Sequence, residues 1–327
     1  MPQFTLRETD EYYQTLLQTV RHAKKTINIA SFDLIYDYKT KELLDAVVTA
    51  AKRGVHVTIT ADVYTFHEIR RKHFGPIDTN HISGKNIRKY VDKLRQEGGK
   101  FVWLGETNVL NPYKNRNHQK WSIIDDEVFC FGGINMYDAG LKNNDFMLHT
   151  HDRDLANFLR QEHERIIQNT NAYLGNTYQI DDTSTCYLDA AEPHASIIYR
   201  HACTLAQKSV AATYVSQYYP TGKLGRLLKK TKSRYYINRP SHMRGLAKYM
   251  IIFDSLRCRI ENSYHKKRYL HAKFIIFTMK DGSKVALTGS HNFSYAGVRY
   301  GTVEIAMKTT NTHTINQLEN FIQKISS

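Results

Sequence analysis

Residues 118–135 read HQKWSIIDDEVFCFGGIN, and this stretch governs the interpretation of the whole chain. It predicts a strand that carries His118 and Lys120, a turn, a second strand near 128–131 and a glycine-containing exit that ends at Asn135. Side chains two positions apart on a strand point to the same face, so the histidine and the lysine should project together.

Residues 271–292 read HAKFIIFTMKDGSKVALTGSHN and repeat the pattern nearly half the chain later. His271 and Lys273 again open a strand, and the exit again ends at an asparagine, Asn292. The second copy is longer around Asp281-Gly282, which is a strong hairpin signal. One His-x-Lys pair is common on strands, but two copies with matching exits indicate an internal duplication and a shared site.

Two juxtaposed copies would place two imidazoles, two ammonium groups and two carboxamides around one cavity. This set suits a phosphodiester, because the cations and amides stabilise charge on the non-bridging oxygens. One imidazole can attack phosphorus while the other protonates the leaving oxygen. We expect no metal and no cofactor. The four cysteines are far apart and form no CxxC pair, so we expect buried thiols rather than zinc ligands.

Each half shows alternating helices and strands. The first predicts helices at 16–23, 43–52 and 87–96 and strands at 26–32, 55–59 and 100–104, an order typical of βαβ units and a mostly parallel sheet. The second predicts helices at 195–207, 224–230 and 243–253 and strands at 210–215 and 234–237. The polar, less regular region 169–192 lies between them, so we predict halves at 1–170 and 171–327.

The chain is strongly basic. Its 327 residues, enough for a substantial core, hold 46 Lys and Arg against 31 Asp and Glu, a net charge of +15. Such a charge favours nucleic acid, acidic lipid headgroups or phosphorylated substrates. The sequence holds no 18-residue apolar run, and its start shows no secretory signal. We therefore expect a cytoplasmic protein, with peripheral attachment to a membrane as an option.

The two motifs resemble those of the phospholipase D superfamily, whose signature is His-x-Lys-(x)4-Asp followed by Gly-Ser-x-Asn. The first copy matches through Asp125 but has Gly133 where serine is usual. The second has Ser290 but carries Thr278 in place of the aspartate. Residues 23–62 are similar to the opening βαβ unit of the family, and 303–305 resemble its acidic strand, so the resemblance covers most of the chain.

The resemblance implies an α/β fold, a pseudo-twofold pair of halves with mixed sheets flanked by helices and the active site at their interface. Family enzymes pass through a phosphohistidine, which implies His118 as nucleophile and His271 as general acid. The implied remaining site residues are the phosphate-binding Lys120, Lys273, Asn135 and Asn292 and the supporting Glu304, Asp145, Asp125 and Ser290.

Three functions compete. A cardiolipin-synthase-like phosphatidyltransferase fits the two fused motifs, a Tyr218-Tyr219-Pro220 turn similar to that of those synthases, and the attraction of a +15 chain to anionic bilayers. A metal-independent nuclease fits the same charge and 22 tyrosines that can stack on bases. A non-catalytic phosphate-binding protein is the third. We favour phospholipid as substrate and an anionic membrane surface as partner, with nucleic acid as the alternative.

Overall fold

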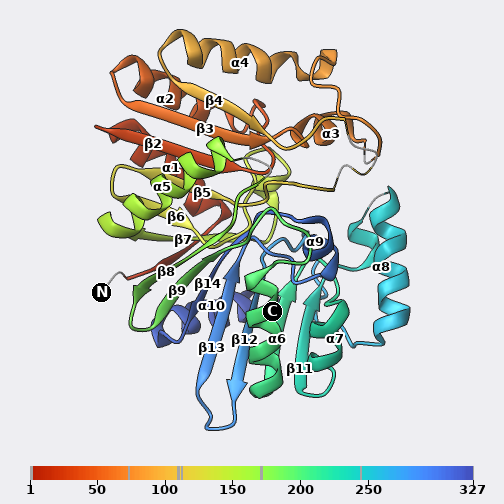
Figure 1. Cartoon of the computed structure of the whole chain (residues 1–327). Helices are drawn as coiled ribbons and strands as arrows, with labels where there is room; N and C mark the ends of the chain where they lie inside the picture. The colour runs from red at the N-terminus through yellow and green to blue at the C-terminus, as the bar shows by residue number, and fades with distance from the viewer. Residues whose placement is uncertain are drawn as a thin grey trace.

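The computed structural model describes residues 3–72, 74–108, 111, 113–169, 172–243 and 245–326, without the side chains of 246 and 247. Two seven-stranded sheets form its frame, one in the upper and one in the lower half of Figure 1. The first takes its strands from before residue 170 and the second from after residue 171. The boundary predicted between 170 and 171 itself lies outside the described residues.

The first sheet has the order β1-β7-β6-β5-β2-β3-β4. Its strands are β1 (Thr5–Glu8), β2 (Thr26–Ser31), β3 (His56–Asp62), β4 (Lys100–Leu104), β5 (Trp121–Ile124), β6 (Glu127–Cys130) and β7 (Phe146–His151). The accompanying helices are α1 (Thr9–His22), α2 (Lys41–Lys52), α3 (Thr65–Arg70), α4 (Lys85–Gln96) and α5 (Arg153–Gln168), with short 3-10 turns η1 (Ile82–Gly84) and η2 (Gly140–Lys142).

The second sheet has the order β11-β10-β12-β13-β14-β9-β8. Its strands are β8 (Asn176–Asp181), β9 (Ser184–Leu188), β10 (Ser209–Ser216), β11 (Lys232–Ile237), β12 (Phe274–Met279), β13 (Lys284–Gly289) and β14 (Ile305–Thr309). The accompanying helices are α6 (Ile197–Lys208), α7 (Gly222–Leu228), α8 (Gly245–Cys258), α9 (Tyr295–Tyr300) and α10 (Thr312–Ser326), with η3 (Pro240–His242).

The two sheets are built alike. The run β3-β2-β5-β6-β7-β1 of the first has the same order and strand directions as β11-β10-β12-β13-β14-β9 of the second. The predicted α/β fold of two related halves is thus confirmed. The mixed sheets that the resemblance implies are also confirmed. The mostly parallel sheet expected from the βαβ order is a wrong prediction, because among the named strands only β2, β3 and β4, and β10 with β11, run parallel. The hairpins that follow the His-x-Lys motifs pair antiparallel.

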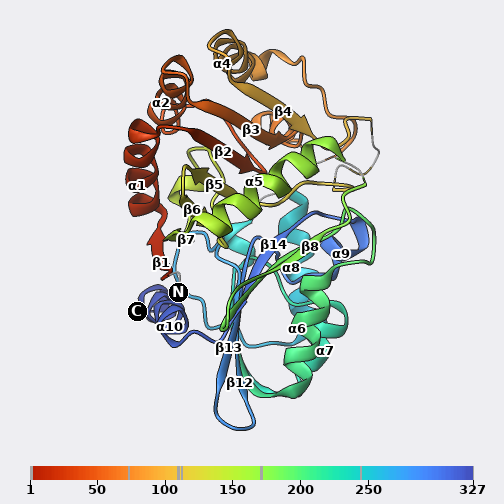
Figure 2. The ribbon, with the colours of Figure 1, turned by 60° about the vertical axis from the view of Figure 1, so that its left-hand side comes forward.

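One hydrophobic core runs from the first sheet into the second. Phe146 of β7 packs against Phe274 of β12 and Phe321 of α10, with ring centroids 5.8 and 5.2 Å apart. Figure 2 shows α10 beside β1, which brings the two ends of the chain close together. A second core lies between the first sheet and α1, α2 and α4, and a third between the second sheet and α6 to α8. Burial of apolar side chains across the junction holds the halves in one arrangement.

The strands missed in the sequence include β8, β9 and β1. The region 169–192, predicted to be irregular, contains the hairpin β8–β9. Strand β8 lies at the sheet edge with alternate residues exposed, so its composition is polar enough to look like a linker. Strand β1 has four residues that are all half-buried, which is too short for a clear period.

The two His-x-Lys pairs were predicted to lie on strands, but both lie just before their strands begin. His118 and Lys120 directly precede β5, and His271 and Lys273 directly precede β12, so neither pair lies within its strand. The reason is that the backbone there pairs with the other half. His118 N donates to Val303 O at 2.8 Å, and His271 N donates to Asn144 O at 2.9 Å.

Among the described helices, none is long and apolar enough to cross a bilayer.

Candidate active site

Each motif histidine is paired with a carboxylate from the opposite half. His118 Nδ1 lies 2.8 Å from Glu304 Oε2, and His271 Nδ1 lies 2.7 Å from Asp145 Oδ2. All four side chains are buried. Glu304 directly precedes β14, and Asp145 directly precedes β7, so these residues occupy equivalent places in the two sheets. We call the two contacts the cross-half pairs; they bring both motifs to one junction.

Burial controls the charge of the imidazoles. Desolvation lowers the pKa of His118 to about 4, although Glu304 opposes the shift. Desolvation also lowers the pKa of His271 to about 4, with Lys273 adding to the effect and Asp145 opposing it. Both rings are therefore neutral at pH 7. A neutral ring that donates Nδ1–H to its carboxylate leaves the Nε2 lone pair free for phosphorus.

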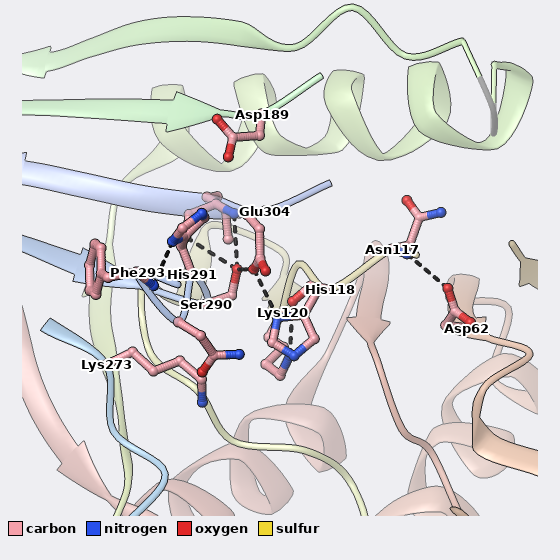
Figure 3. Close-up of polar contacts among 12 residues, drawn as sticks. Asp62, Asn117, His118, Lys120, Asp189, Lys273, Ser290, His291, Phe293 and Glu304 are labelled. Carbon is pink, nitrogen blue, oxygen red and sulfur yellow. Dashed lines mark hydrogen bonds and ion pairs between the residues drawn. The ribbon is translucent and has the colours of Figure 1, made fainter. Parts of the chain in front are cut away.

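Glu304 stays ionised despite its burial. Desolvation acts to raise its pKa, but His118, His291 and Lys120 outweigh it and bring the value down to about 2. Figure 3 shows the Ser290 hydroxyl donating to Glu304 beside His118. The same hydroxyl accepts from Ile305 N at 3.0 Å, so Ser290 fixes the carboxylate against the start of β14.

The motif lysines point into the same junction and are almost completely buried. Lys120 Nζ donates to His118 O at 2.8 Å, and Lys273 Nζ donates to His271 O at 2.5 Å. Lys273 Nζ also lies 3.1 and 3.2 Å from the two ring nitrogens of His271. Desolvation lowers the pKa of Lys120 to about 8 and that of Lys273 to about 7. Lys120 is near enough to Lys273 to lower its pKa further, and two buried ammonium groups that repel each other favour a bound anion.

The two motif asparagines keep unused hydrogen-bonding capacity. Asn135 Nδ2 donates to Asp33 Oδ2 at 3.3 Å. Within the described residues, the buried Oδ1 atoms of Asn135 and Asn292 have no hydrogen-bond partner. The Asn292 carbonyl accepts from Tyr214 and Ser216, which fixes its backbone. Buried amide oxygens without a partner can accept a hydrogen bond from a further group.

Sequence reasoning missed Phe32 and Asp33, which follow β2 and line the junction. The Phe32 ring meets His118 edge-on with centroids 4.7 Å apart, and Lys120 Nζ lies 5.4 Å from its centre. Burial raises the pKa of Asp33 well above its usual range, and Glu68 adds to this shift. A polar residue at the carboxyl end of a parallel strand is the signal that could have identified Asp33.

Two more missed residues position the motifs. Asp62, at the end of β3, accepts from Asn117 N at 2.8 Å and so holds the segment that enters His118 (Figure 3). A buried ion pair with Arg116, 2.9 Å long, holds the same carboxylate. In the second half, Asn238 follows β11 and its Oδ1 accepts from Leu270 N at 2.9 Å, directly before His271. The two halves thus fix their histidines from equivalent strands.

The missing motif serine at Gly133 has a steric reason. A Cβ at this position would lie 2.7 Å from Asp145 Oδ2 and 2.8 Å from Lys273 Nζ, which is closer than real Cβ atoms come. Gly133 N instead donates to Asp145 Oδ1 at 3.2 Å. The first half therefore holds its carboxylate with a backbone amide, whereas the second holds Glu304 with the hydroxyl of Ser290.

The motif aspartate, Asp125, stabilises the turn between β5 and β6 rather than the junction. Asp125 accepts from the backbone N–H groups of Lys24, Lys25 and Thr26 at 2.8 to 2.9 Å and so ties the β5–β6 turn to the start of β2. Its counterpart Thr278 lies inside β12, paired with Lys284 in a longer hairpin. Asp281 makes that hairpin's turn by accepting from Ser283. The replacement at Thr278 thus reflects a displaced turn.

The donor set at the junction consists of nitrogen groups that suit an anion. The described residues contain no group of three or more His, Cys, Asp or Glu side chains arranged to hold a metal ion. All four cysteines are buried and free, as expected. Two neutral imidazoles with ionisable partners, two ammonium groups and two amides can bind a phosphodiester and move protons on both sides of it.

Two family models match the chain. One, described as cardiolipin synthase, PLD-like domain, matches residues 16–167, and the other, described as NgoFVII restriction endonuclease N-terminal PLD domain, matches residues 246–327. Cardiolipin synthase B of Salmonella typhimurium is 28% identical over 130 residues, 40% of this chain and 28% of its own. A cardiolipin synthase of Alkalihalophilus pseudofirmus is 25% identical over 166 residues, 50% of this chain and 29% of its own. The matches thus span less than a third of these relatives.

Solved structures share the whole fold. Phosphatidylserine synthase of Haemophilus influenzae superposes with a TM-score of 0.69 over 99% of this chain and 88% of its own, at 12% identity. Polyphosphate kinase of Porphyromonas gingivalis superposes with a TM-score of 0.64 over 97% of this chain and 46% of its own, at 10% identity. At such identities the likeness concerns the fold alone.

Proposed function

Because the chain belongs to the phospholipase D superfamily, we propose that it is a phosphodiester-cleaving or phosphodiester-exchanging enzyme that acts on phospholipid through a phosphohistidine intermediate. The observation that carries this proposal is the cross-half pairing of His118 with Glu304 and of His271 with Asp145. It gives two imidazoles whose Nδ1 atoms are fixed by carboxylates, so that the Nε2 atoms are the ones left for chemistry, that of His271 lying 3.2 Å from Lys273 Nζ.

The first half-reaction transfers phosphorus to His118. Its Nε2 lone pair forms the N–P bond while the P–O bond to the leaving alcohol breaks, and that oxygen takes a proton from His271. In the second, His271 removes a proton from water or an alcohol whose oxygen attacks phosphorus, and the N–P bond breaks. Water gives hydrolysis and an alcohol gives phosphatidyl transfer. Lys120, Lys273, Asn135 and Asn292 hold the non-bridging oxygens.

The bound substrate supplies the condition for proton donation. His271 is neutral in the empty site, since its pKa is lowered to about 4. A phosphodiester adds a negative charge beside the ring, which raises the pKa of the imidazole and lets it carry a proton. Asp145 stabilises the resulting imidazolium from the other side. The two lysines, also buried, regain their charge in the same way.

Phospholipid is the substrate that the family matches favour. The first half matches the cardiolipin synthase model, and cardiolipin synthases are among the curated relatives that match part of the chain. The net charge of +15 adds attraction to anionic headgroups. We therefore infer a cardiolipin-synthase-like reaction on an anionic phospholipid.

A parallel assay tests the substrate. The protein is given phosphatidylglycerol vesicles and single-stranded DNA in separate reactions containing EDTA, and the products are separated by chromatography. We expect lipid products and intact DNA, with no loss of rate in EDTA, because the site offers imidazole and ammonium groups for the chemistry. DNA cleavage with untouched lipid would overturn the phospholipid assignment. Activity lost in EDTA and restored by a divalent metal would contradict the metal-independent mechanism.

A nuclease is the second candidate, and a specific observation supports it. Residues 246–327, which include His271, Lys273 and Asn292, match the model of the NgoFVII restriction endonuclease PLD domain. The basic surface suits a nucleic-acid backbone as well as a lipid headgroup. In the parallel assay, accumulation of DNA fragments whose yield falls with rising salt would support the nuclease function.

The pH dependence follows from the buried groups. Catalysis needs a neutral His118, whose pKa is lowered to about 4, so kcat/KM should fall as the pH drops through that value. It also needs charged lysines, and the pKa of Lys273 is lowered to about 7 and that of Lys120 to about 8. We therefore expect kcat/KM on a soluble diester such as bis(p-nitrophenyl) phosphate to decline above pH 7 to 8. A value that still rises between about pH 8 and 9 would contradict this account of the lysines.

A further inference from the structure

Helix α8 exposes a large apolar face. Its exposed apolar side chains are Tyr249 (69% exposed), Met250 (46%), Phe253 (63%) and Leu256 (71%). Spacings of four and seven residues put Tyr249, Phe253 and Leu256 on one stripe, with Met250 beside it. Apolar side chains gathered on one exposed helix face mark an interaction surface more often than scattered ones do.

The opposite face of α8 is anchored to the second half. Ile251 and Cys258 are buried in the core between the second sheet and its helices. The helix is thus apolar on both sides, which is typical of a helix that has a second apolar neighbour. In Figure 1, α8 stands at the outer edge of the second half, with its upper end level with the junction of the halves.

Both ends of α8 are tied to neighbouring loops of the second half. At its start, Met243 Sδ accepts from the Tyr269 hydroxyl at 3.7 Å, and the Tyr269 ring lies 6.2 Å from that of His271. At its end, Cys258 Sγ donates to Pro220 O at 3.8 Å, next to the Tyr218-Tyr219 turn. The segment that leads into α8 is therefore linked to His271 through Tyr269.

The charges around the face select its partner. Lys248 and Arg257 on the helix and Arg259 just after it are exposed, and so are Lys229 and Lys230. Lys229 is near enough to interact electrostatically with Cys258. The acidic residue of α8 is Asp254, which is half-buried. A layer with apolar depth and negative headgroups matches this pattern, and a lipid bilayer has that structure.

We propose that α8 is a docking element that inserts Tyr249, Phe253 and Leu256 into an anionic phospholipid surface and so brings the catalytic junction to the headgroups. The proposal rests on the proposed function for its choice of lipid as the partner. It adds that membrane contact is made by this helix rather than by charge spread over the whole surface.

Vesicle flotation tests the proposal. Wild-type protein should float with phosphatidylglycerol vesicles and much less with phosphatidylcholine vesicles. We expect the double variant Phe253→Ser/Leu256→Ser to bind phosphatidylglycerol at least about ten-fold more weakly, because it removes two apolar side chains from the contact. Lys248→Glu should weaken binding by about five-fold or more, and added salt should erase most of that difference.

The matched control is Leu174→Ser. Leu174 is 88% exposed and lies between α5 and β8, so its loss removes a comparable exposed leucine away from α8. We expect this variant to bind vesicles like the wild type, as opposed to Leu256→Ser. In addition, Phe253→Trp adds a third tryptophan to Trp103 and Trp121, and brominated phosphatidylglycerol should quench the fluorescence that this variant has in excess of the wild type. Equal binding by the double variant and the wild type, or an unquenched tryptophan, would overturn the proposal.

Two further readouts separate this inference from the proposed function. Turnover of soluble bis(p-nitrophenyl) phosphate should be the same in the double variant and the wild type, since Phe253 and Leu256 are exposed and have no role in the proposed reaction. Vesicle binding through α8 without lipid turnover would support the docking role and reject phospholipid as substrate. If the double variant instead converts a dimer into a monomer in sedimentation, the face binds a second copy and the lipid proposal fails.

Discussion

His118→Ala should abolish turnover, with kcat on bis(p-nitrophenyl) phosphate falling by about 10⁴-fold or more, as for the loss of other nucleophiles. The imidazole is the nucleophile in the proposed reaction, and the alanine leaves phosphorus without a covalent acceptor. Glu304 also loses its partner at 2.8 Å. Steady-state release of p-nitrophenolate measures the effect, and the lipid or DNA substrate identified in the parallel assay should follow it.

The control must show that the loss is chemical. His163 is a buried histidine of α5 that accepts from Trp121 Nε1 at 3.1 Å, and His163→Gln keeps an acceptor there. This variant should retain turnover even if its melting temperature drops. In His118→Gly, added imidazole can enter the vacated space beside Phe32 and should restore part of the rate. Undiminished activity in His118→Ala would remove His118 from the nucleophile's role.

The α/β fold and the two His-x-Lys motifs could be predicted from the sequence because both depend on local patterns. Alternating helices and strands predict α/β halves, and the repeated His-x-Lys identifies the two histidines that form the cross-half pairs. Strand β4 was predicted at its observed bounds, Lys100–Leu104. Such features require only a period and a turn signal, which a single chain displays.

Contacts between the halves could not be read in the same way. The pairing of Glu304 with His118 spans 186 positions, and no local period encodes it. The resemblance implied Glu304 and Asp145 as supporting residues, but which histidine each one contacts depends on how the sheets face each other. The crowding at Gly133 likewise arises from Asp145 and Lys273, which meet it only in the folded chain. Asp33 belongs to neither His-x-Lys motif, and its place in the site is known only from its contact with Asn135 in the folded chain.

The second large effect separates the two half-reactions. His271→Ala should still form the N–P bond when the leaving group is p-nitrophenolate, which departs without a proton. It should then stall, because no base activates the water that attacks the intermediate. We expect a burst equivalent to one p-nitrophenolate per active site, followed by turnover reduced about 10²- to 10⁴-fold. With a phospholipid, whose alkoxide needs a proton, the first step should slow as well.

Mass spectrometry of the stalled protein tests which histidine carries phosphorus. The adduct should lie on His118, should be lost in acid, and should be absent from the double variant His118→Ala/His271→Ala. Asp145→Asn should weaken the same step more mildly, because it removes the charge that orients His271 and stabilises its imidazolium. An adduct on His271 in the His118→Ala variant would reverse the two assignments. Linear turnover without a burst in His271→Ala would mean that the second half-reaction does not use this imidazole as its base.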